Sequence, residues 1–224
     1  DAVVCESPTY LGAINAFKAY QPKFIEIEMD EHGMIIDKLE KALRNNSNVK
    51  FIYTIPDFQN PSGKTMSVER RKRLIELAVA YNVPIVEDNP YSELRFEGER
   101  IPSLKSMDTE GIVIYLGTFS KTFCPGLRIG WVCASPEMLN KYIILKQGAD
   151  LQPNSLSQRT TAEFMRRNSL DQHIAEIKSV YAARRDLMIK TINEEFPPSC
   201  TCTYPEGGLF TWVSLPEGIN ASEV

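Results

Sequence analysis

Apolar residues are not spread evenly along the chain but fall into short runs with the length of a β-strand. These runs lie at residues 2–5, 23–28, 49–55, 83–87, 112–117 and 131–134. Between them, apolar positions recur at intervals of three and four residues, which is the spacing of one face of an α-helix. The pattern therefore predicts strands that alternate with helices.

Helix-start signals precede several of the helical patterns. Ser67 is placed to cap a helix whose apolar positions fall at i, i+3, i+4 and i+7. Asp37 is expected to cap a second helix, and Ser135 followed by Pro136 marks the start of a third. A longer helical pattern covers residues 170–196 and ends at two consecutive prolines, which cannot continue a helix.

Strands that alternate with helices are typical of an α/β domain built on a mostly parallel sheet. Beyond the long helix, a strand-like stretch at residues 209–215 follows a Pro-Glu-Gly-Gly turn. We interpret this stretch as the beginning of a second, smaller domain. The expected division is a large domain at residues 1–168, then an interdomain helix and the start of the small domain at residues 169–224.

Composition and charge narrow the class of protein. The 224 residues carry 25 Lys and Arg against 29 Asp and Glu, a formal net charge of −4. Nucleic-acid binding needs a basic face, so this balance argues against it. The basic run at residues 70–73 lies beside Glu69 and Glu76 on a predicted helix, and we interpret it as a solvated helix face. No uncharged stretch approaches the ~20 apolar residues of a membrane span, and no signal peptide is visible.

The remaining features indicate a reduced, cytoplasmic protein without a metal site. The cysteines are odd in number, and Cys200 and Cys202 have no second pair or nearby histidine with which to hold zinc. His32 and His173 are isolated. The chain begins at Asp1 in a strand-like run and ends just after a helix-start signal, so we expect it to be a fragment.

Candidate chemistry lies in the segments that follow three of the predicted strands. In open α/β sheets, ligands bind outside the carboxyl ends of the strands, where such segments meet. Asn60 follows the run at residues 49–55, and Asp88 and Tyr91 follow the run at residues 83–87. The segment after residues 112–117 supplies hydroxyl, amine and guanidinium groups, from Thr118, Ser120, Lys121 and Arg128. The sequence therefore predicts one polar site at this edge of the sheet.

The last of these segments suits an anionic ligand and a nucleophilic step. The two hydroxyls and the guanidinium of Thr118, Ser120 and Arg128 match a phosphate group. Lys121 lies near a second cation in an otherwise apolar and hydroxyl-rich stretch. A partly desolvated lysine in such a place is a suitable nucleophilic amine.

The other two segments suit a ring that carries polar atoms. Asp88 ends an apolar strand, where a buried carboxylate needs a partner. That partner is a protonated ring nitrogen, a helix N-terminus or a nearby arginine. Tyr91 lies three residues later and can face the same ligand if the turn is tight. Asn60 can donate to a phenolate oxygen, and its bond to Pro61 lies in a ligand-facing turn, where cis-proline is found.

Taken together, these segments resemble those of pyridoxal-phosphate-dependent aminotransferases of class I/II, fold type I. The resemblance is carried by Asn60-Pro61-Ser62-Gly63, Glu87-Asp88-Asn89-Pro90-Tyr91 and Ser120-Lys121-Thr122-Phe123-Cys124-Pro125-Gly126-Leu127-Arg128-Ile129-Gly130-Trp131. It runs over nearly the whole chain. Residues 88–94 and 146–152 are similar to the 2-aminoadipate/kynurenine aminotransferase-like subgroup. The implied fold is a three-layer α/β/α large domain that lacks its N-terminal part, followed by the start of a small α+β domain that is truncated before its substrate-carboxylate arginine.

The resemblance also implies roles for single residues. Lys121 would form the internal aldimine with pyridoxal 5'-phosphate and would move the proton at the substrate α-carbon. Asp88 would keep the ring nitrogen protonated. Tyr91 and Asn60 would hydrogen-bond the ring oxygen.

The phosphate would be held by Thr118, Ser120 and Arg128, and Tyr10 matches the position of the aromatic residue that covers the cofactor ring. The implied reaction moves an amino group from an amino acid to a 2-oxo acid by a ping-pong mechanism. Enzymes of this fold type are generally homodimers, so a homodimer is expected.

Other functions remain open on the sequence alone. A PLP-dependent β-lyase would share every residue named above. An aminotransferase-like effector domain behind a winged-helix DNA reader would use the same site as a sensor, and only the upstream sequence would distinguish it. A cofactor-free structural domain would leave three convergent polar clusters at strand ends unexplained.

Overall fold

The structure is a computed structural model that describes residues 1–221. Seven strands form one sheet in the order β3-β2-β1-β4-β5-β6-β7. The strands β2, β1, β4, β5 and β6 are parallel, and the edge strands β3 and β7 are antiparallel to their neighbours. The bounds are β1 (Ala2–Ser7), β2 (Lys23–Asp30), β3 (Gly33–Met34), β4 (Val49–Thr54), β5 (Ile85–Asp88), β6 (Val113–Thr118) and β7 (Gly130–Cys133).

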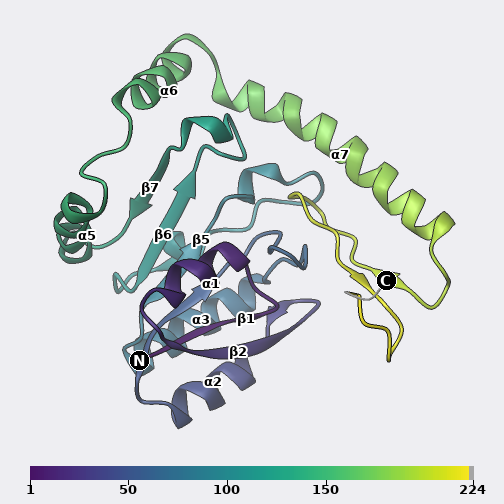
Figure 1. The fold of residues 1–224 in the computed structure, drawn as a ribbon, viewed down its shortest axis with the longest axis horizontal. Helices are drawn as coiled ribbons and strands as arrows, with labels where there is room; N and C mark the ends of the chain where they lie inside the picture. Colours follow the sequence, from purple (N-terminus) through teal and green to yellow (C-terminus); the bar gives the residue numbers. More distant parts are fainter. Residues whose placement is uncertain (222–224) are drawn as a thin grey trace.

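Helices flank this sheet and continue beyond it (Figure 1). Their bounds are α1 (Leu11–Lys18), α2 (Ile36–Asn45), α3 (Val68–Tyr81), α4 (Leu104–Met107), α5 (Pro136–Ala149), α6 (Ser155–Arg167) and α7 (Leu170–Glu195), with 3-10 turns η1 (Ser92–Leu94) and η2 (Pro125–Leu127). The predicted α/β class and mostly parallel sheet are confirmed. The short elements α1 and β3 and the helix α6 were not predicted.

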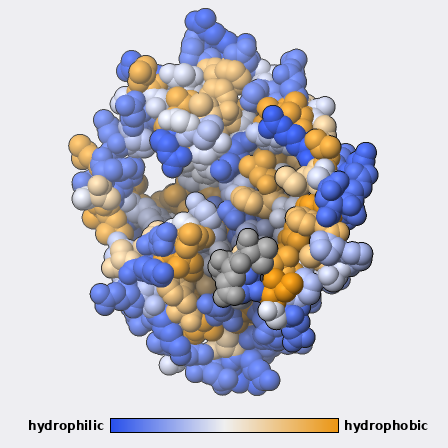
Figure 2. Space-filling model, turned by 45° about the vertical axis from the view of Figure 1, so that its right-hand side comes forward, coloured by the Kyte–Doolittle hydropathy of each residue, from blue (hydrophilic) through white to orange (hydrophobic). Residues whose placement is uncertain are grey.

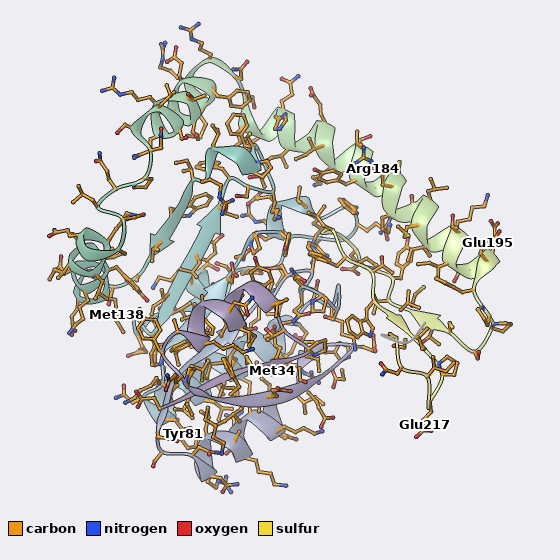
Figure 3. The ribbon with its side chains drawn as sticks, viewed as in Figure 1. Met34, Tyr81, Met138, Arg184, Glu195 and Glu217 are labelled. Atoms are coloured by element: carbon orange, nitrogen blue, oxygen red, sulfur yellow. The ribbon has the colours of Figure 1, made fainter. Side chains whose placement is uncertain are left out.

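The central strands bury both of their faces, which explains the apolar runs in the sequence. Val4 of β1 packs with α2 and α3 on one side of the sheet, while its neighbour Cys5 packs with residues of α1 on the other. Ile52 and Tyr53 of β4 divide in the same way. A sheet covered on both faces by apolar contacts is the expected arrangement for parallel strands. Figure 3 shows side chains crowded around Met34, a fully buried residue of β3.

Two of the three predicted helix caps are confirmed and one is wrong. The Ser67 and Ser135 hydroxyls accept hydrogen bonds from the Arg70 and Met138 amides. Asp37 does not cap α2, because this helix starts at Ile36 and the preceding residue makes no side-chain cap. Asp37 lies in the first turn instead, where its negative charge interacts favourably with the helix dipole.

The edge formed by β7 and α5 is much less buried than the centre of the sheet. All residues of β7 are exposed, and α5 has no buried residue. Apolar side chains of this region, such as Ile144 and Leu145, face solvent in the described chain. Around Met138 the side chains in Figure 3 point outward from α5.

The last part of the described chain returns to the sheet along α7. The expected strand at 209–215 is shorter than predicted, since only β9 (Val213–Ser214) pairs with β8 (Thr201–Cys202). The residues before β9 bond elsewhere: Gly207 forms a bridge with Arg95, and the Gly208 amide donates to Leu94 O at 2.9 Å. Figure 2 shows the side of the molecule that carries this segment, where apolar groups lie among hydrophilic ones. The predicted boundary at 168/169 falls between α6 and α7 and stays a prediction.

Three further findings concern the described residues. None of their helices is long and apolar enough to cross a bilayer. Their His, Cys, Asp and Glu side chains form no group of three or more that could hold a metal ion. All five cysteines are free thiols.

Candidate functional site

The topology places a switch point at the carboxyl ends of β1 and β4. From β1 the chain moves to β2 on one side and later crosses to β4 on the other, so the strand order reverses between β1 and β4. Ligands of open α/β sheets bind where the order reverses. The segment that leads to Tyr10 leaves β1 at this point, and the loop with Asn60 leaves β4 beside it.

The structure brings three of the predicted residues together here. Asn60 hydrogen-bonds the phenol of Tyr91, and the charge of Asp88 acts on the same phenol. The bond between Asn60 and Pro61 is cis, as predicted. Tyr10 also lies near enough to the Tyr91 phenol to influence its ionisation.

Asp88 is the last residue of β5, and its carboxylate lacks a cationic partner. The Tyr53 hydroxyl donates to Asp88 Oδ2 at 2.6 Å. Within residues 1–221 no Lys, Arg or His forms an ion pair with this carboxylate. Burial raises the pKa of Asp88, and the bond from Tyr53 opposes that shift. A ligand with a positive charge at this point would remove the imbalance.

Tyr91 is a hydrogen-bond donor held in a fixed position. Its side chain is 4% exposed, and its ring meets Phe210 edge-on with centroids 5.6 Å apart. Burial raises the pKa of Tyr91 to about 12, although the bond with Asn60 acts in the opposite direction. The phenol therefore keeps its proton at neutral pH and can donate it to a ligand oxygen.

The turn after β6 presents cations. Arg128 Nη1 donates to Ser120 Oγ at 3.5 Å and to Pro125 O at 3.2 Å. Arg128 has φ +54° and ψ +43°, a left-handed conformation that is uncommon outside glycine and occurs at functional sites. Lys121 is partly buried, and within the described residues it forms no ion pair.

The Thr118 hydroxyl is hydrogen-bonded inside the turn. It accepts a hydrogen bond from the Ser120 amide at 3.0 Å and donates its proton to Ile129 O at 3.2 Å. A contact between Thr118 and a phosphate stays a prediction. In this geometry Thr118 shapes the loop that presents Ser120 and Arg128.

Tyr10 precedes the first residue of α1 and is 41% exposed. Its ring lies directly over Gly12. A Cβ atom added to Gly12 would lie 2.4 Å from the Tyr10 ring, so only glycine leaves room for the ring in this orientation.

A buried ionic network behind the site corrects the interpretation of the basic run at 70–73. Arg71 is 0% exposed, and its guanidinium donates to both carboxylate oxygens of Asp57 at 2.8 and 3.1 Å. It also donates to Pro56 O at 3.0 Å. The Asn89 amide joins Asp57 to Glu87. The prediction of a solvated face is wrong for Arg71, because tertiary contacts override the local charge pattern.

Sequence reasoning also missed Glu6, Tyr53 and Gln59, which are all buried near the strand ends. Glu6 could have been found by the argument used for Asp88, since it is a carboxylate that directly follows the apolar run at residues 2–5. Tyr53 and Gln59 gave no local signal, because their partners are 35 and 53 residues away in the chain.

The charges of the site fit pyridoxal phosphate. The carboxylate of Asp88 lies without a cation, and Lys121 and Arg128 lie without an anion in the described chain. A ligand with a protonated ring nitrogen and a phosphate group would satisfy both imbalances. The free amine of Lys121 suits a carbonyl carbon.

The fold is that of an α/β protein whose candidate polar residues lie at the carboxyl ends of its strands. The family model for aminotransferases of class I and II matches residues 1–223. The chain therefore belongs to the class I and II aminotransferase family.

Particular relatives agree with this. The chain is 50% identical over 224 residues to aromatic-amino-acid aminotransferase 1 of Thermococcus litoralis, a match that covers 98% of this chain and 54% of that protein. It is 37% identical over 222 residues to the 2-aminoadipate transaminase of Thermus thermophilus, covering 98% and 55%. The solved structure of a kynurenine aminotransferase from Pyrococcus horikoshii aligns with a TM-score of 0.96 at 45% identity, covering 100% of this chain and 56% of that one. The predicted fold is thus confirmed, and the chain spans about half the length of these relatives.

Proposed function

We propose that this chain is the central part of a pyridoxal-phosphate-dependent aminotransferase that moves an amino group from an amino acid to a 2-oxo acid. The observation that carries the proposal is the pair of complementary charge imbalances at one sheet edge, Asp88 at one place and Lys121 with Arg128 at the other. The names of the relatives support aromatic amino acids, 2-aminoadipate and kynurenine as substrate classes.

The residues would hold the cofactor by charge and hydrogen bonding. Asp88 would accept from the protonated ring nitrogen, and Tyr91 with Asn60 would bond the ring oxygen. Ser120 and Arg128 would bind the phosphate. Tyr10 would stack on the ring, which it can reach because its own ring is exposed beside the switch point.

Lys121 has the task of moving a proton. When bound, the cofactor supplies a protonated ring that accepts the electrons released as the substrate α-carbon loses its proton. Lys121 Nζ would take the proton from that carbon and return it one carbon away. Such a base contributes about 10²–10⁴-fold to a rate. The negative charge of Asp88 would keep the ring in its electron-accepting form.

The test is a visible absorbance spectrum of the intact protein with pyridoxal phosphate, recorded before and after addition of an aromatic amino acid, 2-aminoadipate or glutamate. Replacement of the bound-cofactor band by a pyridoxamine-type band, with release of the 2-oxo acid, is the expected result. A band that shifts without conversion would favour the effector-domain alternative. Release of an eliminated group in place of the 2-oxo acid would favour the β-lyase.

A homodimer and a cytoplasmic location form part of the same proposal. The apolar side chains exposed on α5 would be available for a subunit contact. The free thiols are compatible with a reducing compartment. Light scattering of the intact protein measures its oligomeric state, and a monomer at micromolar concentration would contradict the proposed homodimer.

A further inference from the structure

A buried carboxylate lies near the switch point and has no role in the proposed reaction. Glu6 is the next-to-last residue of β1, near the point where the strand order reverses, and it is 2% exposed. Its carboxylate accepts hydrogen bonds from the Thr54 hydroxyl, from the Ile55 amide at 3.3 Å and from Gln59 Nε2 at 3.1 Å. Within the described residues no cation pairs with it. A buried, uncompensated carboxylate is costly and needs a reason.

Gln59 is the second member of this arrangement. Its side chain is 1% exposed, and Nε2 donates to Pro8 O at 2.8 Å as well as to Glu6. Its Oε1 accepts from the Ser62 amide at 2.9 Å. The Gly63 amide donates to Gln59 O at 2.6 Å, which closes the turn at residues 59–63. One side chain therefore ties the end of β1 to the turn after β4.

The two tied segments are those that carry ligand groups. Asn60 lies inside the closed turn and bonds Tyr91. Tyr10 follows two residues after Pro8, the carbonyl of which Gln59 holds. Because Gln59 bonds both segments, a change at its side chain alters the distance between Tyr10 and Asn60.

We propose that Glu6 and Gln59 form a buried clasp, a pair of positioning residues that fixes Tyr10 and Asn60 at the spacing the cofactor ring requires. This inference rests on the proposed function. Glu6 orients the Gln59 amide so that Nε2 faces β1 and Oε1 faces Ser62. Without the carboxylate, the amide has no acceptor on that side except the Pro8 carbonyl.

The ionisation of Glu6 adjusts the clasp. Burial raises the pKa of Glu6 to about 7, and the charge of Asp88 on β5 acts in the same direction. The other titratable groups whose ionisation is coupled to its charge are the Tyr53 phenol on β4 and the Cys5 thiol on its own strand. A charged acceptor makes stronger hydrogen bonds than a neutral one, but the burial of the charge outweighs that gain, so ionisation of Glu6 lowers the stability of the folded arrangement.

The experiment compares Glu6→Gln, Gln59→Ala and the matched control Glu28→Gln in the intact protein. Glu28 is an exposed carboxylate of β2 that pairs with Lys38 and does not touch the clasp. The first readout is amide hydrogen exchange at Ser62 without cofactor. Exchange should become about tenfold faster in both clasp variants, the effect of one lost hydrogen bond to a charged network, and stay unchanged in the control.

The second readout is the dissociation constant for pyridoxal phosphate. It should rise about tenfold in each clasp variant, and the double variant should lose no more than the larger single effect, since both substitutions remove one shared contact. Unchanged Ser62 exchange in Gln59→Ala would overturn the clasp. Faster exchange with unchanged affinity would overturn its positioning role.

The two proposals fail in different ways. An unmodified protein that binds no pyridoxal phosphate would overturn the proposed function and the positioning role together, while Ser62 exchange would still decide whether the clasp exists. If Glu6→Gln does not fold, Gln59→Ala alone supports or overturns the clasp through the same exchange measurement.

Discussion

The half of the site on β4 and β5 and the half on the turn after β6 meet at one sheet edge but differ in their surroundings. Asp88 and Tyr91 lie among buried side chains and are hydrogen-bonded by Tyr53 and Asn60, respectively. The same half contains the buried network around Arg71. The cationic half is held mainly by backbone carbonyls, as Arg128 is by Pro125. The neighbouring β7 and α5 bury no residue in the described chain.

The two halves differ in how many supporting hydrogen bonds their charged groups need. A buried carboxylate loses its contact with water, and hydrogen bonds from the protein must offset that loss. The first half therefore needs a large supporting network. Lys121 is only partly buried and Arg128 is exposed, so water reaches both and they need no such network. Substitutions in the first half should therefore change the free energy of unfolding, and substitutions in the second should change ligand binding alone.

The largest effect is expected for Lys121→Ala in the cationic half. Loss of the amine should lower the rate of half-transamination by about 10²–10⁴-fold, because the proton at the substrate α-carbon loses its base. Borohydride treatment should no longer fix the cofactor to the protein, which mass spectrometry measures. The free energy of unfolding should change by no more than about 0.5 kcal/mol.

Lys141→Ala, on the exposed face of α5, is the control and should retain both the rate and the fixed cofactor. Cofactor that borohydride still fixes to the Lys121→Ala variant would remove this residue from its proposed role.

Arg71→Met tests the buried half. The substitution leaves Asp57 as a buried carboxylate without its partner, and breaking such a pair costs about 3–5 kcal/mol of unfolding free energy. Urea denaturation measures the loss. Arg73→Met, which removes an exposed pair with Glu76, should cost less than about 1 kcal/mol. Equal losses in the two variants would mean that burial does not separate the halves.

The pH dependence of stability tests Glu6 in the same half. Its pKa is raised from 4.5 to about 7 by burial, so its stabilising contribution is fully present below pH 4.5 and is lost as the pH rises through about 7. At about 1.36 kcal/mol per pKa unit, the loss amounts to about 3 kcal/mol. The unfolding free energy of the unmodified protein, relative to Glu6→Gln, should fall by this amount across that window. A flat difference between the two titrations would show that Glu6 does not titrate there.

How far the sequence predicted this molecule depends on the range of the interactions. Asn60, Asp88, Tyr91, Lys121 and Arg128 could be predicted to share one edge, because the carboxyl ends of parallel strands meet wherever the chain alternates strand and helix. The start of α2 could not, because no polar cap marks it. The burial of Arg71 could not be predicted, because its charged neighbours form the ordinary pattern of an exposed helix. Its burial depends on Asp57, which is distant in the sequence.

The remaining missed features have separate causes. The helix α1 has only eight residues, which is too short for a clear period, and α6 buries only Thr161 among the residues described for it. The clasp could not be predicted from the sequence, because Glu6 and Gln59 are 53 residues apart and meet only through the pairing of β1 with β4.

Arg128→Ala tests how much the cationic half contributes to cofactor binding. Loss of the guanidinium should weaken pyridoxal phosphate binding by about 10- to 100-fold, the effect of one hydrogen bond between charged groups. The unfolding free energy should stay within about 0.5 kcal/mol of the unmodified protein, because Arg128 is exposed. Arg100→Ala, an exposed pair with Glu93, is the control for both titrations. A large loss of stability in Arg128→Ala would contradict the division between the halves.

The smallest effect is expected for Gly12→Ala, where stability and binding should change in opposite directions. Alanine favours a helix over glycine by about 1 kcal/mol, so α1 should gain stability once the Tyr10 ring has moved aside. The new Cβ, 2.4 Å from the present ring position, forces that movement. Because ring stacking contributes about 0.5–1.5 kcal/mol, cofactor affinity should fall by about 2- to 10-fold.

Gly148→Ala on α5 separates the two effects, because no other atom lies within 4 Å of the added Cβ. It should raise stability and leave affinity unchanged. Tyr10→Ala should weaken binding as much as Gly12→Ala does, and the double variant should lose no more than either one, since both remove the same stacked ring. Full additivity of the two losses would mean that Gly12 acts on the cofactor by a route other than Tyr10.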